Sequence, residues 1–429
     1  MNKAIGLDFG TTNSAIGVAD PDRRVTLARF GKDRTFRSLL YFTEDEETRQ
    51  LRVFAGPDAI ENYLNAKSAG RLIQSAKSYL ASRLFSQTQI LGESYTLEEL
   101  IGMLLRQLRQ AAEQEFGELG SALVAGRPVH FSGARDRADD EFALDRLRTA
   151  YRYAGFRDVH FVPEPVAAAY KYRQQLSRAE LVLIADFGGG TSDFSLVHLQ
   201  PNNSPLSGPG DQALGAIIAN DGIGIAGDTF DSKLVRNVVA PLLGLGSEYR
   251  SQFGKILPVP NWLYEHLERW HYLSFLKTRK NMDLLHQLQF QALEPAKLGA
   301  LVDLVDHDLG YRLYRSIEAA KCVLSEQPRT RLHFVEAALA LDHPIGRNEF
   351  EHWIDNDVQK IDHCVDRLLA SCAIKASRID AIFMTGGSSF VPAIRRLFNG
   401  KFPNAPIRAG QEFTSVAEGL ALCALELLG

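Results

Sequence analysis

The feature that most constrains the fold of this chain is a pattern of strand, glycine turn and strand that occurs twice. One copy is the stretch 184–193, IADFGGGTSD, which lies between two apolar runs. The other copy is 4–18, AIGLDFGTTNSAIGV, at the N-terminal end. The DFG triplets that begin at Asp8 and Asp186 match, and they lie 178 positions apart. A repeat of this size predicts two duplicated lobes, each of which opens with a β-hairpin.

Both glycine turns have the composition of a phosphate-binding loop. Glycine lacks a Cβ atom, so the backbone N–H groups of such a turn approach a ligand closely and form a nest for anions. Asp186 and Asp193 border the second turn, and Asp8 precedes the first. Carboxylates do not bind phosphate directly, but they hold Mg²⁺ that phosphate also ligates. Two such hairpins predict one nucleoside triphosphate clamped between the lobes, whereas a single hairpin would fit a plain tight turn equally well.

The composition argues against several classes of protein. The chain has 429 residues, of which 45% are hydrophobic, and its net charge is −4, so a large core is available and a nucleic-acid partner is not expected. Its apolar runs are shorter than a membrane helix requires, and no membrane contact is predicted. The N-terminal strand leaves no room for a signal peptide. Four cysteines without metal-binding spacing indicate reduced thiols and a cytoplasmic protein.

Local periodicity predicts several elements of the first half. A helical pattern over 71–80 predicts a helix that ends near Phe85 and carries Lys77. A lysine among apolar residues is usually a surface side chain whose stem covers apolar atoms. Regularly spaced leucines predict an amphipathic helix over 97–116, and an apolar run predicts a short strand over 128–131.

Glu164 lies between two prolines at the junction of a predicted strand over 159–162 and a helix that starts at Pro165. Ligand sites in α/β folds concentrate at such junctions, although a helix cap explains the same residue. A further glycine-rich turn, over 222–231, is predicted to lead into a helix over 232–239.

Two places in the second half are additional candidate nucleotide contacts. The helix predicted over 311–325 places four side chains on one face, a pattern that is also typical of a solvated surface: Glu318, Lys321, Cys322 and Ser325. Gly386 and Gly387 follow a predicted buried strand and precede a helix led by proline. Free N–H groups and the positive end of a helix dipole favour an anion there.

In their order along the chain, these motifs resemble the nucleotide-binding domain of the DnaK-type chaperones, the heat shock protein 70 family, within the actin and sugar-kinase superfamily. The matching segments are the phosphate loops 8–14 and 186–193, the connecting segment 163–169, the glycine turn 227–231 and the adenosine loop 386–389, together with Glu318, Lys321 and Ser325. The resemblance implies an α/β protein with the actin-like ATPase fold, in which two duplicated, ribonuclease H-like lobes enclose a nucleotide cleft. Shortened bacterial members of the YegD type are the most similar.

The resemblance implies ATP or ADP and Mg²⁺ as cofactors, and a role for each matching residue. Lys77 would orient the attacking water, and the implied catalytic set also contains Glu164, Asp186 and Thr191. The carboxylates implied to hold hydrated Mg²⁺ are Asp8, Glu164 and Asp186, with Asp193 nearby, where the resemblance also allows K⁺. The residues implied to bind the nucleotide are Gly10, Thr11, Thr12, Asn13, Gly188, Gly189, Gly190, Thr191, Gly227, Glu318, Lys321, Ser325, Gly386, Gly387, Ser388 and Phe390.

Two positions depart from the pattern of the family. The family stacks adenine between two arginines, and the corresponding positions here carry Cys322 and Phe390. A phenylalanine ring can still stack on a base, which keeps Phe390 among the predicted nucleotide contacts. The similarity to shortened members further predicts that the chain lacks the β-rich peptide-binding domain of longer members.

The predicted division of the chain has three parts. Lobe I is 1–178, with a subdomain inserted at about 35–121. Lobe II is 179–407, with a helical subdomain inserted at about 226–347. Residues 408–429 form a C-terminal helix that returns to lobe I.

The function predicted from these features is slow, Mg²⁺-dependent hydrolysis of ATP by a chaperone or by a nucleotide-switched protein. An unknown partner protein would read the nucleotide state through the segment 232–317. Three alternatives stay open at this point: a small-molecule kinase of the same superfamily, an actin-like filament protein, and a module that binds a nucleotide without hydrolysis.

Overall fold

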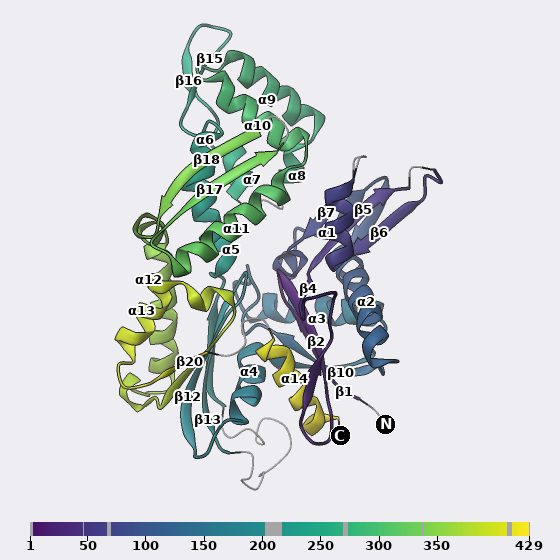
Figure 1. Cartoon of the computed structure of the whole chain (residues 1–429), viewed down its shortest axis with the longest axis vertical. Coiled ribbons are helices and arrows are strands. Elements are labelled where there is room, and N and C mark those ends of the chain that lie inside the picture. The colour runs from purple at the N-terminus through teal and green to yellow at the C-terminus, as the bar shows by residue number, and fades with distance from the viewer. Residues whose placement is uncertain are drawn as a thin grey trace. The chain divides into compact units, whose positions relative to one another are not determined.

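The computed structural model describes residues 3–45, 47–66, 70–201, 217–268, 273–336, 339–409 and 414–428 (Figure 1). These residues form two compact units. The first comprises Met1–Gly227, Lys360–Ser389 and Ile394–Gly429, and the second comprises Asp228–Gln359 and Phe390–Ala393. Both predicted phosphate loops belong to the first unit. The predicted lobe boundary between residues 178 and 179 stays a prediction.

The two largest sheets of the first unit carry the predicted phosphate loops, and the earlier one is built around the N-terminal hairpin. Its strand order is β11-β10-β1-β2-β3, and β4 pairs with β2 off this path. The strands are β1 Ala4–Phe9, β2 Asn13–Ala19, β3 Val25–Leu27, β4 Phe36–Arg37, β10 Ala122–Arg127 and β11 Asp158–Pro163.

The second sheet repeats the arrangement of the first. Its strand order is β14-β13-β12-β19-β20. The strands are β12 Glu180–Phe187, β13 Ser192–Leu199, β14 Ile217–Ile223, β19 Ala381–Thr385 and β20 Ile407–Ala409. In each sheet, three consecutive strands pair antiparallel and two later strands add in parallel. The two hairpins predicted from the sequence repeat are therefore confirmed, and the duplication extends to the whole sheet.

Four helices complete the two halves of this duplication: α3 Arg137–Tyr153, α4 Glu164–Arg173, α13 Pro392–Lys401 and α14 Ser415–Leu427. The helix α3 joins β10 to β11, and α13 joins β19 to β20 in the same way. The last helix of each half packs on the sheet of the other, because α4 contacts β12 and β13 while α14 contacts β1 and β2 (Figure 1). A Cβ atom on Gly419 would lie 1.7 Å from the carbonyl oxygen of Ala167, so this glycine permits the close approach of α14 to α4.

A smaller group of elements lies between β4 and β10 in the sequence. It consists of β5 Leu39–Glu44, β6 Leu51–Ala55, α1 Gly56–Asn65, β7 Arg71–Gln74, β8 Gln87–Ile90, β9 Glu93–Thr96 and α2 Leu97–Phe116. The helix α2 has the predicted bounds. Thr96 and Glu99 form a reciprocal capping box at its start. The predicted apolar stripe of α2 is buried: Leu97, Ile101, Leu104, Leu105 and Leu108.

The prediction of a helix over 71–80 was wrong. Arg71–Gln74 is the strand β7, which pairs antiparallel with β5. Ser75 then adopts a left-handed conformation with φ of 56°, which ends the strand. A single 3₁₀ turn, Ala76–Tyr79, follows and carries Lys77. The strand β5 comes from a distant part of the sequence, and its pairing overrides the local helical pattern.

Two further boundaries were predicted incorrectly. The strand expected over 128–131 is β10, Ala122–Arg127, because Pro128 has no N–H for a sheet and Val129 donates its N–H to the Asp193 carboxylate. The helix expected over 232–239 begins earlier, as α5 Gly227–Leu234. Asp228 in its first turn complements the positive end of the helix dipole. The chain continues as a π-helical turn, Val235–Val239.

As far as its residues are described, the second unit is mainly helical and contains two hairpins. Its helices are α5, α6 Ala240–Leu242, α7 Trp262–Glu268, α8 Leu273–Leu276, α9 Arg279–Gln291, α10 Pro295–Asp306 and α11 Gly310–Glu326. Its strands are β15 Glu248–Arg250 with β16 Ile256–Pro258, and β17 Arg329–Glu336 with β18 Leu339–Gly346. The helix α12, Arg347–Ser371, leads the chain back into the first unit. The predicted buried stripe of α11 is confirmed: Leu313, Ile317, Ala320 and Leu324.

Candidate active site

The two glycine turns of the first unit lie close together. A Cβ atom on Gly190 would lie 3.3 Å from the Thr11 hydroxyl oxygen and 3.8 Å from that of Ser78. Gly190 belongs to the turn after β12, Thr11 to the turn after β1, and Ser78 to the 3₁₀ turn that carries Lys77. The repeat and the lysine turn therefore meet at one place, as a shared phosphate site requires.

Each turn is fixed by its own backbone. In the second turn, the N–H of Gly188 donates to the carbonyl of Thr191 at 2.9 Å. In the first turn, a Cβ on Gly10 would lie 2.1 Å from the carbonyl oxygen of Asn13, so a larger residue does not fit. The side chain of Asn13 accepts a hydrogen bond from Arg37 at 3.1 Å. The predicted loop residues from Gly10 to Asn13 and from Gly188 to Thr191 are at least partly exposed, so a ligand can reach them.

Lys77 and Glu164 form a buried ion pair. The Lys77 Nζ donates to the Glu164 Oε1 at 2.7 Å, and the two side chains are only 8% and 9% exposed. Glu164 is the first residue of α4, directly after β11. Burial alone would lower the pKa of Lys77, but the nearby carboxylates of Glu164 and Asp8 outweigh it and raise that pKa. The lysine is therefore a charged residue of the site, and the alternative of an ordinary surface lysine is wrong.

Three aspartates surround this pair. Asp8 lies in β1, and a Cβ atom on Gly126 would lie 3.6 Å from its Oδ1 and 3.2 Å from the Cγ of Glu164. Asp186 and Asp193 face each other as register partners on β12 and β13. All three aspartate side chains lie at the turn ends of their strands, so the duplicated hairpins bring the carboxylates to one region.

The pKa values of these aspartates are raised, because buried negative charges lie close together. Burial and then the charge of Glu164 raise the pKa of Asp186 to about 6 and that of Asp193 to about 8. The same two causes raise the pKa of Asp8 well above its usual value, against the opposing effect of Lys77. One ammonium does not offset four carboxylates, three of which are buried, so the site favours an additional positive charge.

Asp186 and Asp193 each accept a hydrogen bond from a group that the sequence did not predict. The Thr385 hydroxyl donates to the Asp186 Oδ1 at 2.5 Å, and the Val129 N–H donates to the Asp193 Oδ1 at 2.7 Å. Asp193 also accepts a hydrogen bond from the Thr191 hydroxyl, which the resemblance assigned to phosphate. The only signal for Thr385 in the sequence was its place at the end of a buried strand beside Gly386.

The carboxylates fit a hydrated cation better than a directly coordinated one. Within the described ranges, no group of three His, Cys, Asp or Glu residues lies close enough together to hold a metal ion. Mg²⁺ usually keeps several water ligands and is bound through one or two carboxylates together with phosphate oxygens. Residues that would hold such an ion are Asp8, Asp186, Asp193 and Glu164.

Two more predicted glycine turns lie against the second phosphate loop. Gly386 has φ of +80°, and a Cβ on it would lie 2.1 Å from the Phe187 carbonyl oxygen. Only glycine combines this conformation with such a close approach. The N–H of Gly227 donates to the Gly188 carbonyl at 3.4 Å. Ser388, which follows Gly387 in the same loop, is buried.

The predicted adenosine residues of α11 belong to the second unit. Lys321 forms a buried ion pair with Asp231 at 2.7 Å, and Ser325 donates to the carbonyl of Lys321 at 3.4 Å. The carboxylate of Glu318 lies 3.7 Å from Arg315. Phe390 also belongs to this unit. Adenosine binding by these residues, together with the loop 386–388 of the first unit, stays a prediction.

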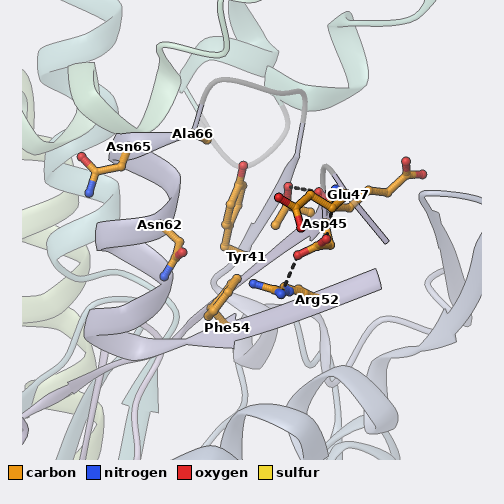
Figure 2. A pocket seen from close by; sticks show the side chains of 10 residues that line it. Tyr41, Asp45, Glu47, Arg52, Phe54, Asn62, Asn65 and Ala66 are labelled. Carbon is orange, nitrogen blue, oxygen red and sulfur yellow. Dashed lines mark hydrogen bonds and ion pairs between the residues drawn. The ribbon is translucent and has the colours of Figure 1, made fainter. Parts of the chain in front are cut away.

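A separate hollow lies on the small group of elements between β4 and β10 (Figure 2). Tyr41 and Phe54 form part of its wall, and the Asp45 carboxylate faces Arg52 across it in an ion pair of 2.5 Å. The lining residues run from Tyr41 to Ala66, and among the described residues none of the predicted site residues contributes to it.

In the part of the chain that the structure describes, no helix combines the length and the apolar character that crossing a bilayer requires.

The paired sheets, with glycine turns beside buried aspartates, define the actin-like ATPase fold. A sequence model of the family described as "Hsp70 protein" matches residues 4–240 and 294–429. The chain belongs to this family, and the resemblance inferred from the motifs is confirmed. The match omits 241–293, which lies within the second unit. Membership of the YegD type stays a prediction.

Curated relatives agree with this family. The "Chaperone protein dnaK1" of Prochlorococcus marinus is 26% identical over 98% of this chain and 56% of its own length. The "Chaperone protein DnaK" of Thermus thermophilus is 25% identical over 100% of this chain and 62% of its own length, and a second strain of that species gives the same values. The chain thus spans about three fifths of the length of these relatives.

Proposed function

We propose that this chain binds ATP with Mg²⁺ and hydrolyses it slowly to ADP and phosphate. The observation that carries the proposal is the buried Lys77–Glu164 pair at 2.7 Å, beside two glycine turns and three aspartates with raised pKa values. Family membership supports the same activity.

Each group has a task in this mechanism. The N–H groups of the turns at Gly10 and at Gly189 and Gly190 bind phosphate oxygens. Lys77 donates a hydrogen bond to the attacking water and holds it in line with the terminal phosphorus, while Glu164 fixes the position of Lys77. When bound, Mg²⁺ offsets the charge of the phosphates and of the carboxylates. The water oxygen forms a bond to the terminal phosphorus, and the bond between this phosphorus and the bridging oxygen breaks, so that this oxygen leaves with ADP. The protons of the water leave with the released phosphate, which exchanges them with solvent.

The test separates binding from hydrolysis. Lys77→Ala should leave ATP affinity within about threefold of wild type while single-turnover phosphate release falls by about 100-fold or more, because positioning groups contribute roughly two to four orders of magnitude. Lys32→Ala, at an exposed lysine, is the matched control. Equal loss of affinity and rate would instead give Lys77 a structural role. Transfer of phosphate to an added sugar rather than to water would favour the kinase alternative.

We further propose that a partner protein binds the segment 232–317, which the sequence singled out. Exposed apolar side chains gather on β16, on the turn that precedes it and at the end of α9, where Phe253 and Phe290 are each 91% exposed. The N–H of Leu293 donates to the carbonyl of Glu248 at 2.8 Å, which joins these parts into one surface. This surface lies in the stretch that the family match omits. Residues 269–272 of the segment lie outside the described residues.

The relatives are named as chaperones, so an unfolded polypeptide is one partner to test. The double variant Phe253→Ser, Phe290→Ser should bind the polypeptide more weakly than the wild-type chain does. Binding to the wild-type chain should differ between ATP and ADP. A partner that binds this variant normally would place the interaction elsewhere. The proposed location is the reducing cytoplasm, where cysteine thiols stay reduced.

A further inference from the structure

The side chain of Arg146 is almost completely buried although no predicted function uses it. Arg146 lies on α3 and is 6% exposed. Burying a guanidinium is unfavourable unless its donors are satisfied and its charge is offset. The groups that satisfy Arg146 therefore indicate what the residue does.

Four of its five recorded acceptors are carbonyl oxygens of one segment. The Arg146 Nη1 donates to the carbonyls of Tyr79, Leu80 and Ser82 at 3.3, 3.4 and 3.1 Å, and its Nη2 donates to that of Phe85 at 3.0 Å. This segment follows directly after the 3₁₀ turn that carries Lys77. One planar fork thus fixes the backbone on the C-terminal side of the lysine.

The fifth acceptor offsets the charge. The Arg146 Nε donates to the Glu98 Oε1 at 2.5 Å, and Glu98 lies in the first turn of α2. The guanidinium carbon also lies 5.3 Å from the centre of the Phe142 ring. With its charge balanced locally, Arg146 does not compete with Lys77 for Glu164.

The segment needs such support because regular secondary structure does not hold it. From Leu80 to Ser86 the chain forms turns and bends rather than a helix or strand. Its own backbone contacts are few, with Leu80 donating to Lys77 at 3.2 Å and Ser82 donating to Tyr79 at 3.0 Å. A rigid fork with several donors loses little entropy for each hydrogen bond that it forms, which suits it to fixing an irregular backbone.

We propose that Arg146 is a positioning residue for Lys77. It holds the turn 76–79 so that the Lys77 ammonium stays in contact with Glu164, and it sets the rate of hydrolysis without touching the nucleotide. This inference rests on the proposed ATPase function.

The test is a double-mutant cycle between Arg146→Gln and Lys77→Ala, with ATP affinity measured by calorimetry and hydrolysis by single-turnover release of labelled phosphate. Arg146→Gln should lower the rate about tenfold with ATP affinity within about threefold, since a misplaced catalytic group loses rate rather than binding. Arg146→Lys should recover part of the rate, because a point charge reaches fewer of the carbonyls. In the Lys77→Ala background, Arg146→Gln should cause no further loss.

Further variants control for effects that are not specific to Arg146 and for a variant that fails to fold. Arg148→Gln removes an arginine from the same helix whose Nη1 pairs with Asp145, and it should leave affinity and rate unchanged. If Arg146→Gln fails to fold, Glu98→Gln and Arg146→Lys take its place, and each is combined with Lys77→Ala in the same double-mutant cycle. A folded Arg146→Gln variant with a wild-type rate would overturn the inference, as would an equal rate loss with and without Lys77. A wild-type protein that releases no phosphate would instead refute the proposed function itself.

Discussion

The two halves of the first unit share a scaffold but differ in chemistry. In the second half, Asp186 faces Asp193 across its hairpin, whereas in the first half Asp8 faces Ala15. The parallel neighbour of Asp186 is Thr385, which donates a hydrogen bond to it. At the corresponding place in the first half, Gly126 leaves space that the Glu164 side chain occupies.

This difference shows how a duplicated frame acquires an asymmetric site. The first half supplies Asp8, the Lys77–Glu164 pair and, beside Gly126, the space that the Glu164 side chain occupies. The second half supplies Asp186 and Asp193, which accept hydrogen bonds from the neutral donors Thr385 and Val129. In the proposed mechanism, the half with Asp186 and Asp193 is the cation side, and the half with Lys77 and Glu164 is the water-positioning side.

The largest expected effect is the pH dependence of stability in the metal-free protein. Asp186 and Asp193, with pKa values of about 6 and about 8, hold protons in the folded state that an unfolded chain has lost above its usual pKa of 3.8. The free energy of unfolding should therefore fall as pH rises from about 4 to 8, by a few kcal/mol. Urea unfolding across this range measures it.

The variant Asp193→Asn tests whether this aspartate of the second half causes part of the pH dependence. It should abolish the decline between about pH 6 and 8 and leave, at lower pH, only the shallower decline that Asp186 causes. A decline between pH 6 and 8 that stays as steep as in wild type would show that Asp193 is not the group that titrates there.

The second prediction concerns the cation side. Asp186→Asn should lower the affinity for ATP in the presence of Mg²⁺ by about 10- to 100-fold and leave the weaker affinity without Mg²⁺ nearly unchanged, because a charge partner of the ion is lost. Calorimetry with and without Mg²⁺ measures both. Unchanged affinity would remove Asp186 from the metal site.

The third prediction concerns the water-positioning side. Gly126→Ala would place a Cβ atom 3.2 Å from the Glu164 Cγ and 3.3 Å from a methyl carbon of Leu420. The displaced Glu164 should hold Lys77 less well, and phosphate release should slow about tenfold with little change in ATP affinity. Gly133→Ala, where a Cβ atom meets open space but φ is +80°, controls for a general loss of stability. A larger effect on affinity than on rate would contradict this assignment.

The smallest expected effect is at Tyr151, on the crossover helix of the first half. Its ring is buried, and within the described residues its hydroxyl has no hydrogen-bond partner. Tyr151→Phe should leave stability unchanged or raise it by up to about 1 kcal/mol in urea unfolding. Tyr172→Phe, which loses a hydrogen bond of 2.7 Å to Glu180, should be destabilising by about 1 kcal/mol or more. A destabilised Tyr151→Phe would indicate a buried partner such as water.

What the sequence predicted well was local in origin. The two hairpins and the helix Leu97–Phe116 follow from alternation, glycine placement and a capping residue within a few positions. The segment 71–80 was predicted wrongly because its conformation depends on β5, some 30 positions earlier. Lys77 and Glu164 lie 87 positions apart, so only the resemblance to a family could pair them.

Residues that act through others were not predictable. Thr385 and Arg146 carry no local signal, because a threonine after a strand and an arginine on an amphipathic helix are common. Their roles depend on which backbone atoms the fold brings within hydrogen-bond distance. The adenosine contacts on α11 were predicted from spacing and family pattern, and they stay predictions.

The most direct test of the account is titration calorimetry of the wild-type chain with ATP, ADP and GTP, each with and without Mg²⁺. Adenine-nucleotide binding should strengthen by about tenfold or more with Mg²⁺, since the ion offsets the charge of the four carboxylates as well as that of the phosphates. Binding that is equally strong without Mg²⁺, or a folded chain that binds no nucleotide, would contradict the central claim that the paired glycine turns and their carboxylates form a metal-assisted phosphate site.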